Sequence, residues 1–456
     1  MRIEKDTLGE VEVPESAYYG AQTQRALNNF KASGKTFPAG FIKAYLILKK
    51  ACARANAECG KLEKDKKDLI VKACEQAEMM TDQFKVDVFQ AGAGTSFNMN
   101  VNEVVANLAA EKLGKEKGDY SFIHPNNHVN MSQSTNDTFP TASHIAVLWK
   151  SELLLEVLDD LAEAFKAKSR EFSEVMKSGR THLMDATPVT VGHEFGAYAS
   201  SLERCANLIR DGRVILMEVP LGSTATGGGD NAPEGFKELV LDDLSELTVL
   251  SLRKPADSYE PLQSRFGLSV FSGYLNVLAR ELNRIANDLR LLNSGPTAGL
   301  AEIALPAVQP GSSIMPGKVN PVMAECLNML CFKIIGNHAA VSEASQAGQL
   351  ELNVMTPVMT SSILESLELL INYLPDFQKL CVEGISVNKK RCRELLLSNP
   401  SLATLLSTEI GYDRAAKLAR ESVETGIPVP ELALQKGLIR KEKAAEIFKN
   451  LYKEES

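Results

Sequence analysis

The chain has 456 residues, of which 44% are hydrophobic and 24% charged, a balance typical of globular rather than disordered proteins. Its formal net charge of −8 argues against general binding to nucleic acids or acidic membranes, because either partner requires a basic surface. The opening residues lack the apolar core of a signal peptide, and no apolar run approaches the roughly 18 residues that span a bilayer.

The eight cysteines and six histidines give no sign of a disulfide framework or a metal site. No CxxC pair occurs, and most cysteines lie in apolar, helix-like segments, where a free cysteine is commonly a small core residue. The histidines show neither HExxH nor another ligand spacing. We therefore expect a cytoplasmic protein with reduced thiols, no metal, no cofactor, and neither a membrane nor a nucleic-acid partner.

Up to about residue 130 the chain mixes short helical patterns with turns, and helices are predicted near 40–58 and 64–80. A longer pattern then begins, with a single gap at Ser151. Its apolar positions are Val147, Leu154, Leu158, Leu161 and Phe165. Further helices are predicted near 192–215, 320–345 and 357–383.

The clearest periodicity in the chain belongs to a predicted helix that starts at Leu268 and ends before Gly295-Pro296. Its apolar residues are separated by alternating steps of three and four, as in the seam of a helix that packs into a bundle. They are Leu268, Phe271, Leu275, Leu278, Leu282, Ile285, Leu289 and Leu292. At ~1.5 Å per residue the helix would be about 40 Å long. Because so long a seam needs partners, we expect oligomerisation.

Strand-like alternation is scarce, so the sequence predicts a mainly α fold with a long central helical bundle. Three domains are expected. Residues 1–130 would form a mainly helical N-terminal domain, 131–387 the central long-helix bundle, and 388–456 a small C-terminal domain of short helices joined by Gly and Pro turns.

The segment QAGAGTSFNMNVNE, Gln90 to Glu103, is rich in glycine and small polar residues. It lacks the GxGxxG spacing and a preceding apolar strand, which argues against a dinucleotide loop. Glycines beside Thr95, Ser96 and Asn98 would let the backbone approach a ligand closely. The alternative is a helix N-cap in which Thr95 or Ser96 serves only the backbone.

A second segment, HPNNHVNMSQSTNDTFP at 124–140, is dense in neutral hydrogen-bonding side chains and contains no lysine or arginine. Ser134, Thr135 and Asn136 precede an apolar helix and could direct hydroxyls, an amide and backbone N–H groups at an anion. The alternative is again a capping segment.

In a third segment, GRTHLMDATPVTVGHEF, Thr181 and His182 precede an apolar residue. A lone histidine in such a place is more often structural than catalytic.

The fourth segment, GSSIMPGKVNP at 311–321, is the most informative. It is not a phosphate-binding loop, because the GxxxxGK[ST] count is off by one and Val319 replaces the required hydroxyl. What remains is a glycine-bounded double serine followed by Lys318 and Asn320. Such a turn can place a serine beside a substrate carbon, and the lysine can neutralise a carboxylate.

GSSIMPGKVNP is similar to the signature of the aspartase/fumarase superfamily, and the other three segments match that superfamily in order and spacing. The resemblance covers essentially the whole chain, including the opening EKDTLGEVEVPESAYYGAQTQRAL and the segment AGQLELNVMTPV. It implies a three-domain helical subunit, a homotetramer built on a twenty-helix core, and active sites that combine three subunits around a small carboxylate substrate.

The resemblance also implies a role for each matching residue. Ser312, the first serine of the signature, would be the base, and His182 would pair with Glu325 near the leaving group. Proton removal beside a carboxylate produces a doubly charged aci-carboxylate, which an enzyme must stabilise with preorganised donors and positive charge. The residues expected to bind substrate are Thr95, Ser134, Thr135, Asn136, Thr181, Ser313, Lys318 and Asn320.

Three segments favour the elimination of ammonia from L-aspartate to give fumarate. GAGTSFNMN and HVNMSQSTND resemble aspartases, and NVMTPV has the aspartase methionine where fumarases usually have phenylalanine. Three departures leave the substrate open: Asp230 within TGGGDN, Thr297 in place of the usual arginine, and Met184 in place of the usual glutamine. The alternatives are fumarate hydratase, a lyase that eliminates an amine from a betaine such as ergothioneine, and an inactive helical scaffold.

Overall fold

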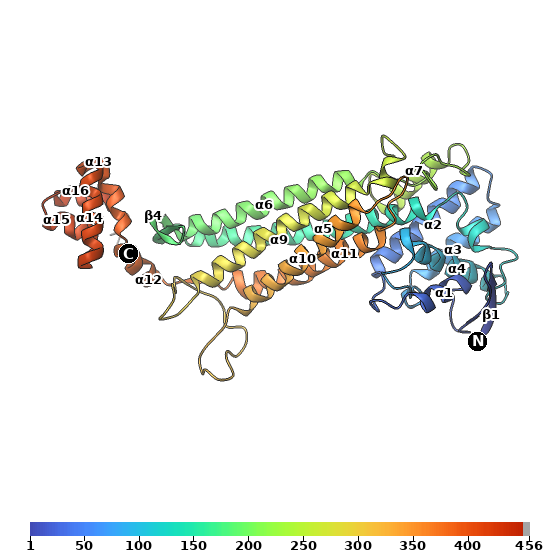
Figure 1. The fold of residues 1–456 in the computed structure, drawn as a ribbon, viewed down its shortest axis with the longest axis horizontal. Coiled ribbons are helices and arrows are strands. Elements are labelled where there is room, and N and C mark those ends of the chain that lie inside the picture. The colour runs from blue at the N-terminus through green and yellow to red at the C-terminus, as the bar shows by residue number, and fades with distance from the viewer. Residues whose placement is uncertain (450–456) are drawn as a thin grey trace. The chain divides into compact units, whose positions relative to one another are not determined.

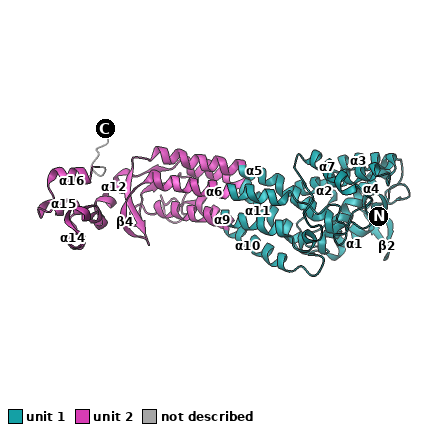
Figure 2. Ribbon diagram, turned by 90° about the horizontal axis from the view of Figure 1, so that it is seen from above, with its two compact units in different colours: residues 1–155, 207–279, 332–371 teal, residues 156–206, 280–331, 372–456 magenta. Residues whose placement is uncertain are grey.

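The computed structural model describes residues 1–449 and is mainly helical (Figure 1). It forms two compact units, which are coloured separately in Figure 2. Unit 1 comprises residues 1–155, 207–279 and 332–371, and unit 2 comprises 156–206, 280–331 and the residues from 372 onward. The predicted fold class is confirmed, whereas the division into three domains remains a prediction.

Within each unit, parts of five long helices run alongside one another (Figures 1 and 2). They are α5 (Thr135–Glu171), α6 (Val191–Leu216), α9 (Phe266–Leu292), α10 (Val322–Gln346) and α11 (Thr356–Phe377), and after α11 the chain continues into the π-helix η4 (Gln378–Val382). All eight seam residues predicted between Leu268 and Leu292 are buried, with at most 5% of their surface exposed. The seam therefore faces the core, as its spacing predicts.

The gap at Ser151 in the α5 pattern is a buried polar contact. The Ser151 hydroxyl donates to the carbonyl oxygen of Leu148 at 2.8 Å and accepts a hydrogen bond from Arg213 of α6 at 2.7 Å. A leucine there would leave a guanidinium hydrogen without this partner, and a buried donor without an acceptor is costly.

The N-terminal part contains more short elements than the sequence predicts. A hairpin of β1 (Arg2–Asp6) and β2 (Gly9–Val13) comes first. The helices of this part are α1 (Ala21–Asn29), α2 (Ala39–Glu58), α3 (Lys64–Ala77) and α4 (Thr95–Lys112), with short turns η1 (Thr81–Gln83), η2 (Gly92–Gly94) and η3 (Pro125–Val129). The helices predicted near 40–58 and 64–80 are thus confirmed. Later in unit 1 come α7 (Phe236–Thr248) and α8 (Glu260–Gln263).

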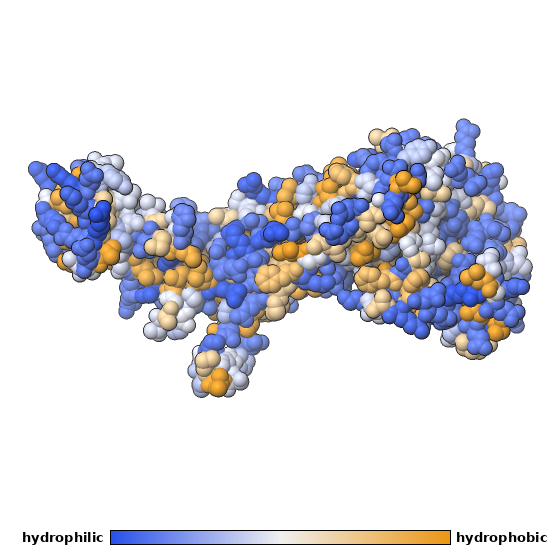
Figure 3. All heavy atoms as spheres, viewed as in Figure 1, coloured by the Kyte–Doolittle hydropathy of each residue, from blue (hydrophilic) through white to orange (hydrophobic). Residues whose placement is uncertain are grey.

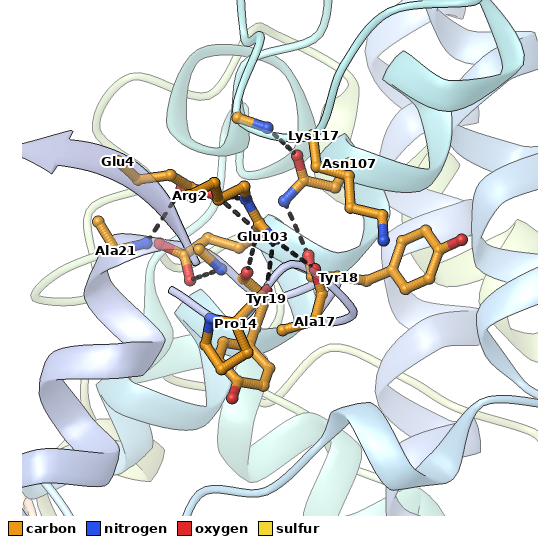
Figure 4. Close-up of polar contacts among 12 residues, drawn as sticks. Arg2, Glu4, Pro14, Ala17, Tyr18, Tyr19, Ala21, Glu103, Asn107 and Lys117 are labelled. Carbon is orange, nitrogen blue, oxygen red and sulfur yellow. Dashed lines mark hydrogen bonds and ion pairs between the residues drawn. The ribbon is translucent and has the colours of Figure 1, made fainter. Parts of the chain in front are cut away.

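The partly buried Arg2 and the buried Glu103 hold the segments that follow the N-terminal hairpin in place (Figure 4). The Arg2 guanidinium donates to the carbonyl oxygens of Pro14, Ala17 and Tyr19 at 2.7–2.8 Å. Glu103 of α4 accepts hydrogen bonds from three backbone N–H groups and one hydroxyl of the segment 20–23. Burial raises the pKa of Glu103. This residue, the last of the glycine-rich segment, is therefore an anchor of the fold.

The C-terminal part of unit 2 consists of short helices around their own apolar cluster, which includes Leu402, Leu418, Leu432 and Phe448. The elements are α12 (Lys389–Leu397), η5 (Pro400–Leu406), α13 (Ser407–Ile410), α14 (Tyr412–Thr425), α15 (Val429–Gln435) and α16 (Lys441–Ile447). Two small sheets also belong to unit 2: β3 (Met176–Thr181) with β4 (Met184–Thr190), and β5 (Ile303–Ala304) with β6 (Ser386–Val387). Between residues 1 and 449, no helix combines the length and apolar character needed to cross a bilayer.

Candidate active site

The glycine-rich segment turns sharply just before α4 begins at Thr95. Ala93 and Gly94 have φ values of 61° and 88°, in the left-handed region. A Cβ on Gly94 would overlap the ring of Phe139, so only glycine fits. Gln90 caps the helix by accepting the N–H of Phe97 at 2.8 Å, whereas the exposed Thr95 hydroxyl has only a 3.3 Å contact with the Gly92 carbonyl. The capping role considered for Thr95 therefore belongs to Gln90.

The second polar segment ends in a reciprocal cap at the start of α5. The Ser134 hydroxyl accepts the N–H of Asn136 at 3.2 Å, and the Asp137 carboxylate accepts the N–H of Ser134 at 3.1 Å. Asp137 is fully buried and also accepts the N–H groups of Gly222 and Thr224 at 3.0 and 2.9 Å. Burial raises its pKa to about 7. Asp137 was missed by the sequence analysis, although the Ser-x-x-Asp spacing signals such a cap.

These contacts bring distant segments of unit 1 together around the starts of α4 and α5. Asn98 of α4 donates to the Thr135 hydroxyl at 3.0 Å, and Asn136 donates to the carbonyl oxygen of Ala225 at 2.8 Å. The buried Arg265, also missed from the sequence, donates to the carbonyl oxygens of Asn136 and Asn353 at 3.3 Å each. Three of the predicted binding residues, Ser134, Thr135 and Asn136, thus belong to one constellation, and Thr95 is the first residue of α4, one turn before Asn98.

The TGGGDN segment lies beside this constellation, because it directly follows Ala225. Its glycine N–H groups at 227 and 229 both donate to the Ser223 carbonyl oxygen at 3.1 Å. Asp230 is exposed on the resulting loop. Nothing in the structure assigns a partner to this carboxylate within unit 1, so its bearing on the substrate stays an open prediction.

The third segment is a β-hairpin, which the sequence analysis did not predict. Thr181 pairs with Met184 across a two-residue turn in which His182 and Leu183 have φ values of 57° and 61°. Two positive φ values are typical of a type I′ turn, which favours Asn-Gly over His-Leu. Thr181 and His182 are therefore exposed together at the tip of the hairpin.

Strand β3 of this hairpin is fixed by ion pairs with a buried carboxylate. Glu302 is fully buried and accepts a hydrogen bond from each of the two terminal nitrogens of the Arg180 guanidinium at 2.9 Å. The same carboxylate lies 3.0 Å from Lys177, which also contacts Glu194 at 2.8 Å. These ion pairs hold strand β3 in place up to the residue before the exposed tip.

The signature segment forms a self-contained loop between α9 and α10 (Figure 1). Its two stems touch, because the Ser312 N–H donates to the Lys318 carbonyl oxygen at 3.0 Å and a Cβ on Gly311 would overlap that oxygen. The Ser312 hydroxyl oxygen accepts the N–H groups of Ile314 and Met315 at 3.3 and 3.2 Å. These dipoles stabilise negative charge on that oxygen.

The remaining residues of the signature are open to solvent in the single chain. Ser313 and Lys318 are exposed, and Asn320 is partly exposed. Apolar side chains gather at the tip of this projecting loop (Figure 3). Among the apolar residues of the signature segment, Ile314 is 82% exposed. Glu325 lies in the first turn of α10. Across the described residues of one chain, no hydrogen bond or ion pair joins His182 with Glu325, and no group of His, Cys, Asp and Glu side chains has the makings of a metal site.

The family described as "Lyase" matches residues 9–336, and "Fumarase C C-terminus" matches residues 402–453. The chain is 45% identical to an aspartate ammonia-lyase from Bacillus sp, over 98% of this chain and 96% of the relative. It is 44% identical to a class II fumarate hydratase from Brucella suis, over 97% and 96% of the two chains. The structure of a class II fumarase from Schistosoma mansoni superimposes with a TM-score of 0.96 at 36% identity, covering 99% of this chain and 98% of that chain.

The matches extend over both units and include all four polar segments. They confirm the resemblance expected from the signature loop. The chain belongs to the aspartase/fumarase superfamily of lyases.

Proposed function

We propose that the chain is a homotetrameric aspartate ammonia-lyase, which converts L-aspartate to fumarate and ammonia in the cytoplasm. The observation that carries this proposal is the 45% identity, over nearly the full length of both chains, to an aspartate ammonia-lyase. The eight cysteines, all of which are free thiols, suit a reducing compartment.

In the proposed reaction Ser312, as the alkoxide, takes a proton from the substrate carbon next to the side-chain carboxylate. A serine hydroxyl is too weak an acid to do this unless its anion is stabilised. The hydrogen bonds from Ile314 and Met315 to Ser312 Oγ support that role, because they supply two donors to the developing charge. Lys318 and Asn320, at the end of the same loop, would hold a substrate carboxylate, with Ser313 beside them.

The electron pair left by the proton makes an aci-carboxylate, which then collapses. The new carbon–carbon double bond forms, the carbon–nitrogen bond breaks, and ammonia leaves. The start of α5, with Ser134, Thr135 and Asn136, would supply donors to the second negative charge, together with the exposed hydroxyl of Thr95. Each such donor is worth about 3–4 kcal/mol in the transition state.

Thr181 and His182 would complete the site near the leaving group, with Glu325 orienting the imidazole. We propose that they reach it from other subunits, so that one active site combines three chains. The exposure of His182 at its hairpin tip and of Lys318 on its loop supports this arrangement, because both are free to contact another subunit.

The test is absorbance near 240 nm, where fumarate absorbs, with aspartate and malate as separate substrates and a panel of amino acids and betaines beside them. We expect fumarate from aspartate alone. Fumarate from malate alone would instead establish a hydratase, which is the second candidate because of the 44% identity to a fumarate hydratase. A product from a betaine alone would contradict both.

The role of Ser312 is tested by Ser312→Ala, with Ser313→Ala as the matched variant on the same loop. Ser312→Ala is expected to lower kcat by at least about 10³-fold while the Kd of succinate, a dicarboxylate that cannot be eliminated, changes little. Ser313→Ala should have a smaller effect and act mainly on KM. Near-normal turnover by Ser312→Ala would remove Ser312 as the base.

A further inference from the structure

Beneath the start of α5 lies a lysine that the proposed reaction does not use. Lys49 of α2 is fully buried, and its ammonium donates to three side-chain amide oxygens. The acceptors are Asn98 Oδ1 and Gln133 Oε1, each at 2.8 Å, and Asn130 Oδ1 at 3.0 Å. An ammonium has three donor hydrogens, so this one is saturated by the protein and has none left for a ligand.

Burial lowers the pKa of Lys49 to about 8, so the side chain is still charged at neutral pH. Burying a charge is costly, and here the three hydrogen bonds to amide oxygens offset that cost. Its three partners are all amides, whose oxygen and nitrogen ends are interchangeable in shape but opposite in hydrogen bonding. The ammonium therefore determines which end of each amide faces it.

The orientation imposed by Lys49 is best defined at the side-chain amide of Asn98. Its oxygen accepts from Lys49 and also from the Tyr45 hydroxyl at 3.2 Å, so its nitrogen must face the other way. That nitrogen donates to the Thr135 hydroxyl oxygen at 3.0 Å. Thr135 thus accepts from inside the protein, and its own hydrogen finds no acceptor in residues 1–449.

We propose that Lys49 is a positioning residue that, through Asn98, fixes the direction of the Thr135 hydrogen bond, so that the Thr135 hydroxyl donates to a carboxylate of the bound substrate. An ionised carboxylate only accepts hydrogen bonds, so a Thr135 hydroxyl that donated its hydrogen inside the protein could not bind the substrate carboxylate. The inference rests on the proposed function insofar as that function places Thr135 against a dicarboxylate.

The test is a double-mutant cycle read by calorimetric titration with succinate, which needs no turnover. Lys49→Met and Thr135→Val are each expected to raise the Kd of succinate by about tenfold, the loss of one hydrogen bond to a charged group. The double variant should bind no more weakly than the weaker single variant. Multiplying effects would show that Lys49 acts independently of Thr135 and would overturn the proposal.

Two further variants serve as a second cycle and as a matched control. Asn98→Asp keeps an oxygen for Lys49 but replaces the nitrogen that donates to Thr135 by a second acceptor oxygen. It should therefore weaken succinate binding when Thr135 is present. In the Thr135→Val background the same substitution should weaken succinate binding much less. This cycle decides the matter if Lys49→Met does not fold. Lys50→Met removes the next lysine of α2, which pairs with Glu75 at 3.2 Å, and should leave the Kd unchanged.

The test of Lys49 can fail or succeed independently of the test of the proposed reaction. An enzyme that fails to release fumarate from aspartate but shows the coupled loss of succinate binding refutes the reaction and supports the role of Lys49. If fumarate is released from aspartate but the Lys49 and Thr135 variants affect succinate binding independently, the reaction is supported and the role of Lys49 is refuted. A wild-type protein that does not bind succinate overturns the proposed role of Lys49.

Discussion

Replacing Glu302 by glutamine would remove the carboxylate that binds Arg180 and Lys177 of strand β3 in the β3–β4 hairpin. Glutamine has nearly the same shape, so packing is preserved and the change isolates the charge. Lys177 keeps Glu194 at 2.8 Å, whereas Arg180 loses a carboxylate that binds two of its nitrogens. The uncompensated group is therefore Arg180.

The size of the effect follows from burial. Removing one partner of a buried ion pair costs about 3–5 kcal/mol of stability, because the other charge is left without compensation. Glu302 is fully buried, but the Arg180 side chain is 16% exposed and glutamine retains one acceptor oxygen. We therefore expect the lower end of that range, about 3 kcal/mol. A fall in kcat should accompany it, because Thr181 and His182 follow Arg180 directly.

The assay is urea unfolding at a fixed protein concentration, with Glu281→Gln as the matched control. Glu281 pairs with Arg284 at 2.9 Å at the surface, where such pairs contribute ~0.2–1 kcal/mol. The free energies of unfolding, obtained from the midpoints and slopes, should differ by about 2 kcal/mol or more between the two variants. Equal losses would refute the reasoning that burial makes the Glu302 pair strong.

Two further predictions concern unit 1. Gly94→Ala should cost about 1–3 kcal/mol more than Gly114→Ala, since both glycines have positive φ but only a Cβ at Gly94 would overlap Phe139; urea unfolding compares them, and equal losses would show that Phe139 moves aside. The buried His144, whose Nδ1–H donates to the carbonyl oxygens of Leu216 and Glu218 at 3.1 and 3.0 Å, has its pKa lowered by burial to about 4. As the pH falls, His144 therefore gains its proton in the unfolded chain at a higher pH than in the folded chain. The stability that the neutral His144 contributes above about pH 6.5 is lost as the pH falls towards 4, by up to about 3 kcal/mol. His144→Gln should flatten this part of the pH profile of unfolding; an unchanged slope would assign it to other groups.

Much of the fold was predictable because the helices carry their burial pattern locally. In α9 the large apolar core residues from Leu268 to Leu292 are each separated from the next by three or four positions, so the sequence alone defines the buried face. The β3–β4 hairpin was not predictable in this way. Its residues are mostly polar and its turn is His182-Leu183, without the Asn-Gly that usually marks a type I′ turn.

Candidate site residues could be proposed from the sequence where they stand in recognisable segments, but the long-range contacts around them could not be predicted. Ser312, Lys318 and Thr135 stood out from their neighbours in the sequence. Lys49 did not, because a lysine on an apolar helix usually extends to solvent, and only the fold brings three amide oxygens to it. Asp137 and Arg265 likewise have roles that appear only when distant loops meet.

The closed stems of the signature loop have one more consequence. Within residues 1–449, both hydrogen bonds to the Ser312 hydroxyl come from backbone N–H groups of the segment 311–318, so a swing of that segment about its ends would carry the serine and its donors as a unit. The two donors that would stabilise the proposed Ser312 alkoxide would therefore stay with the serine at any position of the segment.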